Sequence, residues 1–136
     1  MISELRRDPT SGAWVAIASA RSRRPSDFKI THGEQKTGTC PFCYGSEHMT
    51  PPEILALGRE GQAPNTEGWQ VRVVPNKFPA FSLDYEGSID PDSRAEGQDG
   101  LYVSIPAVGI HEVVVESPEH DSTFGTHSQD QMEDIL

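Results

Sequence analysis

The only two cysteines of this 136-residue chain lie three positions apart, in the segment Cys40-Pro41-Phe42-Cys43. A framework of disulfides needs cysteines spread along the chain, so this pairing excludes a fold held together by several disulfides. Two thiols at this spacing bind one metal ion as thiolates, or cycle between a dithiol and a disulfide. They can also be two inert buried thiols, and the surrounding residues must distinguish these three roles.

The residues around the pair favour metal binding over redox chemistry. In a glutaredoxin-type site, the cysteine motif follows a buried strand and opens a helix whose N-terminus lowers the pKa of the first thiol. Here a polar run, residues 36–39, precedes the pair, and Tyr44-Gly45-Ser46 follows it without a helix signal. The spacing suits Zn²⁺, which takes four ligands, so two more must come from elsewhere.

Two histidines are candidates for the third metal ligand. His48 completes the spacing Cys-x-x-Cys-x4-His, which opens a zinc knuckle, but Glu53 occupies the next ligand position of that motif. His120 lies at the exit of a strand predicted over residues 111–116, where a side chain can turn back toward a neighbouring loop. The ordinary role of a single histidine is a surface or hydrogen-bonding one, so both assignments stay open. The remaining histidines are His111, which begins that strand and can face the core or the site, and His32 and His127, which we expect to be solvated.

Short apolar runs of strand length are typical of this sequence. Trp69, Val71 and Val73 alternate with other residues and are predicted to share one face of a strand that stops at Pro75. Further strands are predicted over residues 13–18, after a tight turn at 8–12, and over residues 101–105 and 111–116. A capping box at residues 128–131 opens a helix near the end of the chain. Residues 84–100, rich in acidic residues, are predicted to be an exposed loop.

The segment Thr50-Pro51-Pro52-Glu53 has the form of a capping box with proline at the first helical position. Only four apolar residues, 54–57, follow before Gly58, and this is short for a helix. The pattern equally allows a strand over residues 53–57.

The formal net charge of −10 is unevenly distributed. Residues 1–36 contain seven of the eleven Lys and Arg residues and only four of the 21 acidic ones, so the rest of the chain is strongly acidic. An acidic body argues against nucleic-acid or anionic-membrane binding, because phosphate backbones need a basic surface. The sequence has neither a run of about 20 apolar residues nor the apolar core of a secretory signal near its start. Together with the absence of scattered cysteines, this predicts the cytoplasm as the location.

Two polar segments are candidates for binding a small ligand. Arg21, Arg23 and Arg24 follow the first long apolar run. They form either a solvated charge run or a phosphate clamp, since guanidinium groups donate paired hydrogen bonds to phosphate oxygens. Asn76, between a strand end and a proline-bounded loop, either closes an Asx-turn or presents its amide to a ligand.

Taken together, these segments resemble the galactose-1-phosphate uridylyltransferase family of the histidine-triad superfamily. Each segment is weakly diagnostic alone, but six of them in the family's order, across nearly the whole chain, are highly specific. In chain order they are residues 7–9 with 12–15, residues 21–25, residues 40–43, residues 50–53, residues 73–80, and residues 109–113 running into 117–120.

The resemblance implies an α+β fold, an antiparallel β-sheet with flanking helices, as the histidine-triad-like half of a uridylyltransferase that forms a homodimer. It makes residues 53–57 a strand that forms a hairpin with residues 69–74. It also implies a structural Zn²⁺, whose fourth ligand belongs to a His-x-His-x-Gln motif beyond Leu136. Residues 1–136 are thus expected to be an N-terminal domain that is incomplete at its C-terminal end. The zinc ligands within the chain are Cys40, Cys43 and His120.

The resemblance further implies where the substrates bind. Arg21 and Arg24 correspond to residues that grip the diphosphate of the nucleotide and reach across the dimer interface into the partner's site. Asn76, and the backbone around Met49 and Thr50, correspond to the nucleotide-binding surface.

The activity implied is that of a UDP-glucose–hexose-1-phosphate uridylyltransferase of galactose metabolism. A histidine attacks the α-phosphorus of UDP-glucose, glucose 1-phosphate leaves, and galactose 1-phosphate accepts the uridylyl group, which divides one difficult step into two easier ones. That histidine belongs to the motif beyond Leu136, so this chain alone is expected to be inactive. Residues 109–118 also resemble the ADP-glucose phosphorylase branch, which transfers the nucleotidyl group to phosphate. The alternative class is a non-enzymatic zinc-binding interaction module that uses Cys40, Cys43 and His48.

Overall fold

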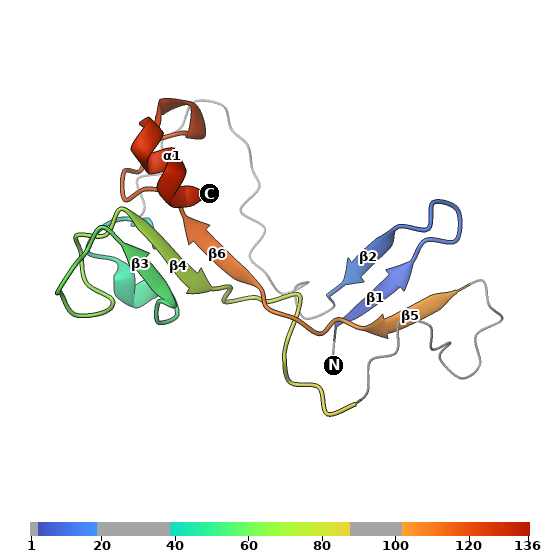
Figure 1. Cartoon of the computed structure of the whole chain (residues 1–136). Helices are drawn as coiled ribbons and strands as arrows, with labels where there is room; N and C mark the ends of the chain where they lie inside the picture. Colours follow the sequence, from blue (N-terminus) through green and yellow to red (C-terminus); the bar gives the residue numbers. More distant parts are fainter. Residues whose placement is uncertain (1–2, 19–38, 88–101) are drawn as a thin grey trace. The chain divides into compact units, whose positions relative to one another are not determined.

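The computed structural model describes residues 3–18, 39–87 and 102–136. Within these ranges, six strands form two three-stranded antiparallel sheets, and one α-helix follows the last strand (Figure 1). This confirms the predicted α+β class, with the strands divided between two sheets. The described residues belong to two units, one with residues up to 18 and residues from 78 to 111, the other with residues 39–77 and 112–136. None of the described helices has the length and apolar character needed to cross a membrane.

The first unit contains a sheet of strand order β2-β1-β5. Its strands are β1 (Glu4–Arg7), β2 (Trp14–Ile17) and β5 (Val103–Pro106). The tight turn predicted between the first two is confirmed, because Asp8 exchanges backbone hydrogen bonds with Gly12 and Ala13, each 2.8 Å long. Hydrogen bonds from the Ser11 side chain, and then from the backbone and side chain of Thr10, lower the pKa of Asp8 to about 2.

The second unit contains a sheet of strand order β3-β4-β6. Its strands are β3 (Leu55–Leu57), β4 (Val71–Pro75) and β6 (Glu112–Val115). β3 pairs with β4 in the register Leu55 to Val73, so the predicted hairpin is confirmed and the helix alternative for this segment is wrong. The reason is the length of the segment. Three residues are fewer than one turn of an α-helix, but they can pair along a neighbouring strand.

The core of this second unit surrounds the central strand β4. Trp69, Val71, Val74 and Val115 are buried, with exposures of 0% to 7%. The prediction that one face of this strand is apolar is incomplete, because β4 is covered on both faces. Successive residues point to opposite faces of a strand, so Val71 and Val74 bury different faces, and Arg72 is also buried at 1% exposure.

The helix α1 (Gln129–Ile135) begins where the capping box predicts it. The side chain of the N-cap residue Ser128 accepts a hydrogen bond from the backbone N–H of Gln131. Gln131 then fastens the helix to the sheet, because its Nε2 donates to the carbonyl oxygens of Gln70 and Glu116. These two carbonyls lie just before the start of β4 and just after the end of β6, so α1 lies at this end of the sheet.

Candidate functional site

The structure brings Cys40, Cys43 and His120 together. One ligand atom from each residue, the two thiol sulfurs and a ring nitrogen, lies within 4.8 Å of the others. The Sγ atom of Cys43 is 3.4 Å from Nδ1 of His120. Both cysteines are half-buried and the histidine is exposed. The three side chains converge from two parts of the second unit that are far apart in the sequence.

The cysteine side of this group is shaped by a tight turn. The backbone N–H of Phe42 donates to the Sγ of Cys40, and the N–H of Cys43 donates to the Cys40 carbonyl, both at 3.4 Å. A third bond, from the N–H of Ser46 to the Cys43 carbonyl, closes the following turn at 3.1 Å. Backbone donors aimed at sulfur stabilise a thiolate, which is the form that binds a metal.

The histidine side of the group is shaped by the exit of β6. Ser117 accepts a hydrogen bond from the backbone N–H of Glu119 through its Oγ at 3.1 Å, and Ser122 donates its Oγ–H to the Glu119 carbonyl at 3.0 Å. These bonds turn the chain sharply, and His120 lies inside the turn. A pocket of about 360 Å³ extends from the group along β6, and it is lined by Cys40, Phe42, Cys43, residues 113–120 and Ser122.

The electrostatics of the group fit a bound cation. Burial raises the pKa of the Cys43 thiol, and the neighbouring Cys40 thiol and the charge of Asp121 raise it further. Two thiols this close resist ionising together unless a cation compensates their charges. Two sulfur ligands and one imidazole match the donor set of structural zinc, and metal binding would release the thiol protons.

The other candidate histidines have different positions. His48 is exposed and lies outside the three-residue group. His111 serves the first unit, where its Nδ1 accepts the backbone N–H of Ala80 at 2.9 Å and its ring meets Phe81 edge-on. The expectation that His127 is solvated is wrong. Its side chain is only 6% exposed, because it lies 3.7 Å from Glu116 and the ring of Phe124 meets it edge-on. His32 lies outside the described residues.

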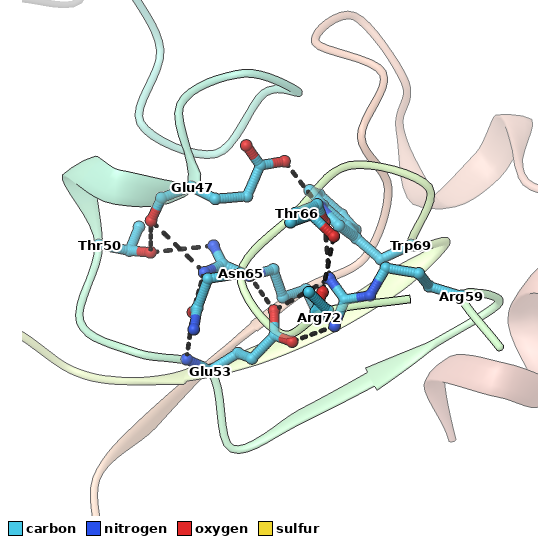
Figure 2. Close-up of polar contacts among 9 residues, drawn as sticks. Glu47, Thr50, Glu53, Arg59, Asn65, Thr66, Trp69 and Arg72 are labelled. Carbon is cyan, nitrogen blue, oxygen red and sulfur yellow. Dashed lines mark hydrogen bonds and ion pairs between the residues drawn. The ribbon is translucent and has the colours of Figure 1, made fainter. Parts of the chain in front are cut away.

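A second cluster in the same unit is a buried polar network around Arg72 (Figure 2). Arg72 lies on β4, and its guanidinium donates Nε–H to Glu53 Oε2 at 2.9 Å. Its Nη1 donates to Thr50 Oγ1 at 2.9 Å, and its Nη2 donates to Asn65 Oδ1 at 3.1 Å and to the Glu47 carbonyl at 3.5 Å. A buried guanidinium is stable only when its donors are satisfied in this way.

Glu53 is the negative centre of this network. Its side chain, 5% exposed, forms ion pairs with both Arg72 and Arg59. Burial alone would raise the pKa of Glu53, but hydrogen bonds from Arg59, the Asn65 backbone and Arg72 lower it to about 2. Arg59 also donates to the Thr66 carbonyl at 2.6 Å. Among the described residues, the Nε of Arg59 is a buried side-chain nitrogen without a hydrogen-bond partner, so Arg59 is the less well satisfied of the two arginines.

Trp69 connects this network to the turn that contains the two cysteines. Its Nε1–H donates to the buried carboxylate of Glu47 at 3.0 Å. The ring of Tyr44, the residue after Cys43, meets the Trp69 ring edge-on with centroids 5.3 Å apart. The Tyr44 hydroxyl also donates to the Trp69 carbonyl at 2.5 Å. One continuous set of contacts therefore extends from the cysteines to the network around Arg72.

The predicted substrate-binding residues have varied environments. Met49, in the 3-10 helix η2 (Glu47–Met49), is 42% exposed. Thr50 is half-buried, and its hydroxyl donates to the Glu47 carbonyl at 3.0 Å while it accepts from Arg72. Asn76 follows β4 directly and is half-buried. Arg21 and Arg24 lie outside the described residues.

Sequence reasoning missed the network around Arg72 altogether. The available signal was the arginine itself, which interrupts an otherwise apolar strand, together with Glu53 in a proline-bounded segment. Each could equally have been an exposed charge, and the partners are 7 to 25 residues apart in the sequence.

Comparisons with known proteins define the class of this chain. No family model matches the sequence. The curated ADP-glucose phosphorylase of Arabidopsis thaliana is 36% identical over 120 residues, which are 86% of this chain and 31% of that protein. The crystal structure of an ADP-glucose phosphorylase from the same plant, with bound ADP-glucose, has a TM-score of 0.50 and 33% identity over 98% of this chain and 34% of the other.

Two further solved structures extend the comparison. A uridylyltransferase has a TM-score of 0.52 and 26% identity, over 97% of this chain and 31% of the other. A GalT-like protein from Arabidopsis thaliana has a TM-score of 0.50 and 29% identity, over 96% of this chain and 32% of the other. These neighbours are nucleotidyl-transfer enzymes, and the chain spans about a third of their length. The chain resembles the galactose-1-phosphate uridylyltransferase family of the histidine-triad superfamily along 96% to 98% of its length.

Proposed function

We propose that the chain is the N-terminal domain, residues 1–136, of an enzyme that transfers a nucleotidyl group from a nucleoside diphosphate sugar. The observation that carries this proposal is the similarity to an ADP-glucose phosphorylase along 98% of the chain at 33% identity. The cluster of Cys40, Cys43 and His120 supports it, because the motif resemblance implies those same three ligands. A binding module would need only a local match around the cysteines.

In this proposal the metal is a structural Zn²⁺. Cys40, Cys43 and His120 would hold it, and the fourth ligand comes from the His-x-His-x-Gln motif of the family. Bound zinc supplies rigidity, because it joins the turn before β3 to the exit of β6. A reducing compartment such as the cytoplasm keeps both thiols available as ligands.

The proposed substrate contacts combine charged and neutral residues. Arg21 and Arg24 grip the diphosphate, and in a homodimer they do so in the site of a second copy. Met49, Thr50 and Asn76 form the surface that binds the nucleotide. Their positions in the structure support this role, because Met49 is exposed and Asn76 follows the end of a strand, where side chains are available to ligands.

The reaction proposed is a double displacement. A histidine of the His-x-His-x-Gln motif attacks the α-phosphorus and forms a covalent nucleotidyl intermediate while glucose 1-phosphate leaves. The 136 residues contain no histidines spaced as His-x-His. We therefore expect the chain by itself to bind the nucleotide sugar without turning it over.

Two donor and acceptor pairs are candidates. UDP-glucose with a hexose 1-phosphate as acceptor follows from the motif resemblance, and the uridylyltransferase structures at 26% and 28% identity support it. ADP-glucose with phosphate as acceptor is supported by the phosphorylase at 36% identity over 120 residues. The two differ in the nucleobase, so a direct comparison of the donors separates them.

A chimeric enzyme tests this function. This chain would replace the segment of the Arabidopsis ADP-glucose phosphorylase that it matches, and the chimera would be assayed for release of glucose 1-phosphate from ADP-glucose and from UDP-glucose. We expect release from one donor in clear preference to the other. The parent enzyme and a chimera with His120→Ala are the controls, and zinc content reports folding. A zinc-loaded chimera that cleaves neither donor would contradict the proposal.

A further inference from the structure

The buried network around Arg72 holds the segment that carries two of the proposed nucleotide-binding residues. The Nη1 of Arg72 donates to Thr50 Oγ1 at 2.9 Å, and its Nη2 donates to the Glu47 carbonyl at 3.5 Å (Figure 2). One guanidinium therefore contacts both ends of the short turn that contains Met49. Met49 itself is 42% exposed. The turn is fixed from the protein interior and presents Met49 outward.

We propose that Arg72 is a positioning residue for nucleotide binding, which acts by holding residues 47–50 in the conformation that receives the nucleotide. This inference rests on the proposed function, in which Met49 and Thr50 form part of the nucleotide-binding surface. Arg72 does not touch the nucleotide in this account. It acts through Thr50 and the Glu47 carbonyl.

The turn needs such support because its own hydrogen bonds are few. The N–H of Met49 donates to the Ser46 carbonyl at 2.9 Å, and the N–H of Thr50 donates to the Glu47 carbonyl at 3.4 Å. A 3-10 turn of three residues has poor hydrogen-bond geometry and little intrinsic stability. The contacts from β4 and from Trp69, which binds the Glu47 carboxylate, supply the remaining stabilisation.

The guanidinium is itself held in one orientation. Glu53 Oε2 accepts from Nε, and Asn65 Oδ1 accepts from Nη2. Asn65 Oδ1 also accepts the backbone N–H of Glu53 at 2.8 Å, so the two acceptors are tied to each other. Only arginine presents its donors in a rigid plane that reaches all of these acceptors, and a lysine ammonium cannot. The arrangement is specific for arginine at position 72.

Arg59 provides an internal control. Its side chain is 5% exposed and pairs with the same carboxylate of Glu53. It also donates to the Thr66 carbonyl, so its hydrogen bonds go to Glu53 and Thr66 and not to residues 47–50. A variant at Arg59 therefore disturbs the same buried ion cluster but leaves the contacts of Arg72 to Thr50 and Glu47 in place.

The test compares Arg72→Lys with Arg59→Lys in the 136-residue chain. Urea unfolding measures stability, and calorimetric titration with ADP-glucose and with UDP-glucose measures the Kd under conditions in which circular dichroism shows each variant to be folded. If the turn adopts its binding conformation about a tenth of the time, the apparent Kd rises about tenfold. We expect that rise for Arg72→Lys and a change of less than about twofold for Arg59→Lys. Amide exchange at Met49 and Thr50 should accelerate in the first variant alone.

Thr50 supplies a second arm that keeps the Arg72–Glu53 ion pair intact, and it carries the test if Arg72→Lys does not fold. Thr50→Val should weaken binding more than Thr50→Ser, which keeps the hydroxyl that accepts from Arg72. Arg72→Lys combined with Thr50→Val should bind no more weakly than the worse single variant.

The outcomes separate the two proposals. If the wild-type chain binds a nucleotide sugar and a folded Arg72→Lys variant binds it equally well, the role of Arg72 is refuted while the function stands. Equal losses in the Arg59 and Arg72 variants would show that the cluster serves stability alone and would also refute it. A wild-type chain that binds neither nucleotide sugar overturns the nucleotide site and this inference together.

Discussion

The Sγ atom of Cys43 lies 3.4 Å from Nδ1 of His120, although 77 positions separate the two residues in the sequence. A metal ion that joins them closes a long loop of the chain. Closing a loop restricts the unfolded chain, and the loss of its conformational entropy favours the folded state. The metal is therefore expected to stabilise the second unit well beyond the immediate surroundings of the three ligands.

The first prediction concerns metal content. We expect about one Zn²⁺ per chain in the wild type, because the two thiols and one imidazole match a structural zinc site. His120→Ala should bind substantially less zinc, measured by elemental analysis after dialysis. His48→Ala should bind as much as the wild type, because His48 is exposed and outside the group. The reverse result, loss at His48 and not at His120, would instead support the zinc-module alternative.

The second prediction concerns acid stability. The pKa of Glu53 is lowered to about 2 in the folded protein from an ordinary value of 4.5. A lowered pKa means that its contribution is fully present above about pH 4.5 and is lost as the pH falls through 2. This contribution is on the order of 3 kcal/mol, because each pH unit between the folded and unfolded pKa is worth about 1.4 kcal/mol. The free-energy difference between wild type and Glu53→Gln, from urea unfolding, should stay constant from pH 7 to 5 and shrink below that range.

The matched control for this experiment is Glu60→Gln. Glu60 is exposed and lies in the loop between β3 and β4, so its replacement should change the free energy of unfolding by less than about 0.5 kcal/mol. If the difference in the free energy of unfolding between wild type and Glu53→Gln does not depend on pH, the Glu53 carboxylate is not held ionised by its two arginines.

The third prediction compares the two tryptophans. Trp69→Phe removes the donor to Glu47 Oε1 and leaves a carboxylate of 6% exposure without that hydrogen bond. An unsatisfied buried acceptor costs about 1–3 kcal/mol, so urea unfolding followed by circular dichroism should show a loss of that size. Trp14→Phe, at 42% exposure, should cost less than about 0.5 kcal/mol. Similar small losses of stability in both variants would argue against a stabilising hydrogen bond from the Trp69 indole nitrogen.

The fourth prediction compares two glycines with positive φ. Gly58 has φ +84°, and a Cβ there would lie 2.7 Å from Gln70 Cγ and 3.0 Å from Gln70 Cβ. Gly61 has φ +72° and nothing within 4 Å of such a Cβ. Gly61→Ala should therefore lower the free energy of unfolding only by the strain of a positive φ, about 1–2 kcal/mol, while Gly58→Ala should lower it clearly more. Adding Gln70→Ala to Gly58→Ala should recover part of the difference in urea unfolding.

The local elements of the fold could be predicted because their signals lie within a few residues. Ser128 and Gln131 identify the start of α1, and the turn at residues 8–12 follows from its Asp, Pro and Gly. For residues 53–57 the pattern alone allows a helix or a strand, because the capping signals and the short length point in different directions, and the resemblance to the family favours the strand. The division of the strands between two sheets depends on pairing between distant segments, which the sequence pattern does not contain.

The two clusters of the site differ in how far the sequence could reveal them. Cys40 and Cys43 stand out by composition alone, but residue spacing left His48 and His120 both possible, and the resemblance to a family favoured His120. For Arg72 the sequence pattern predicts the wrong environment, since a charged residue in an alternating strand is expected to face solvent. Its burial depends on Glu53, which lies just before β3, and on Asn65, in the loop between β3 and β4, and only the tertiary fold brings both to it.

The contact between Tyr44 and Trp69 has a practical consequence for following this protein in solution. Tyr44 is the residue next to Cys43, and its ring meets a fully buried indole edge-on. Any rearrangement of the cysteine turn moves the tyrosine and changes the surroundings of that indole. We therefore expect the emission of Trp69 to report metal loading, with the solvent-exposed Trp14 as a reference signal from the other unit.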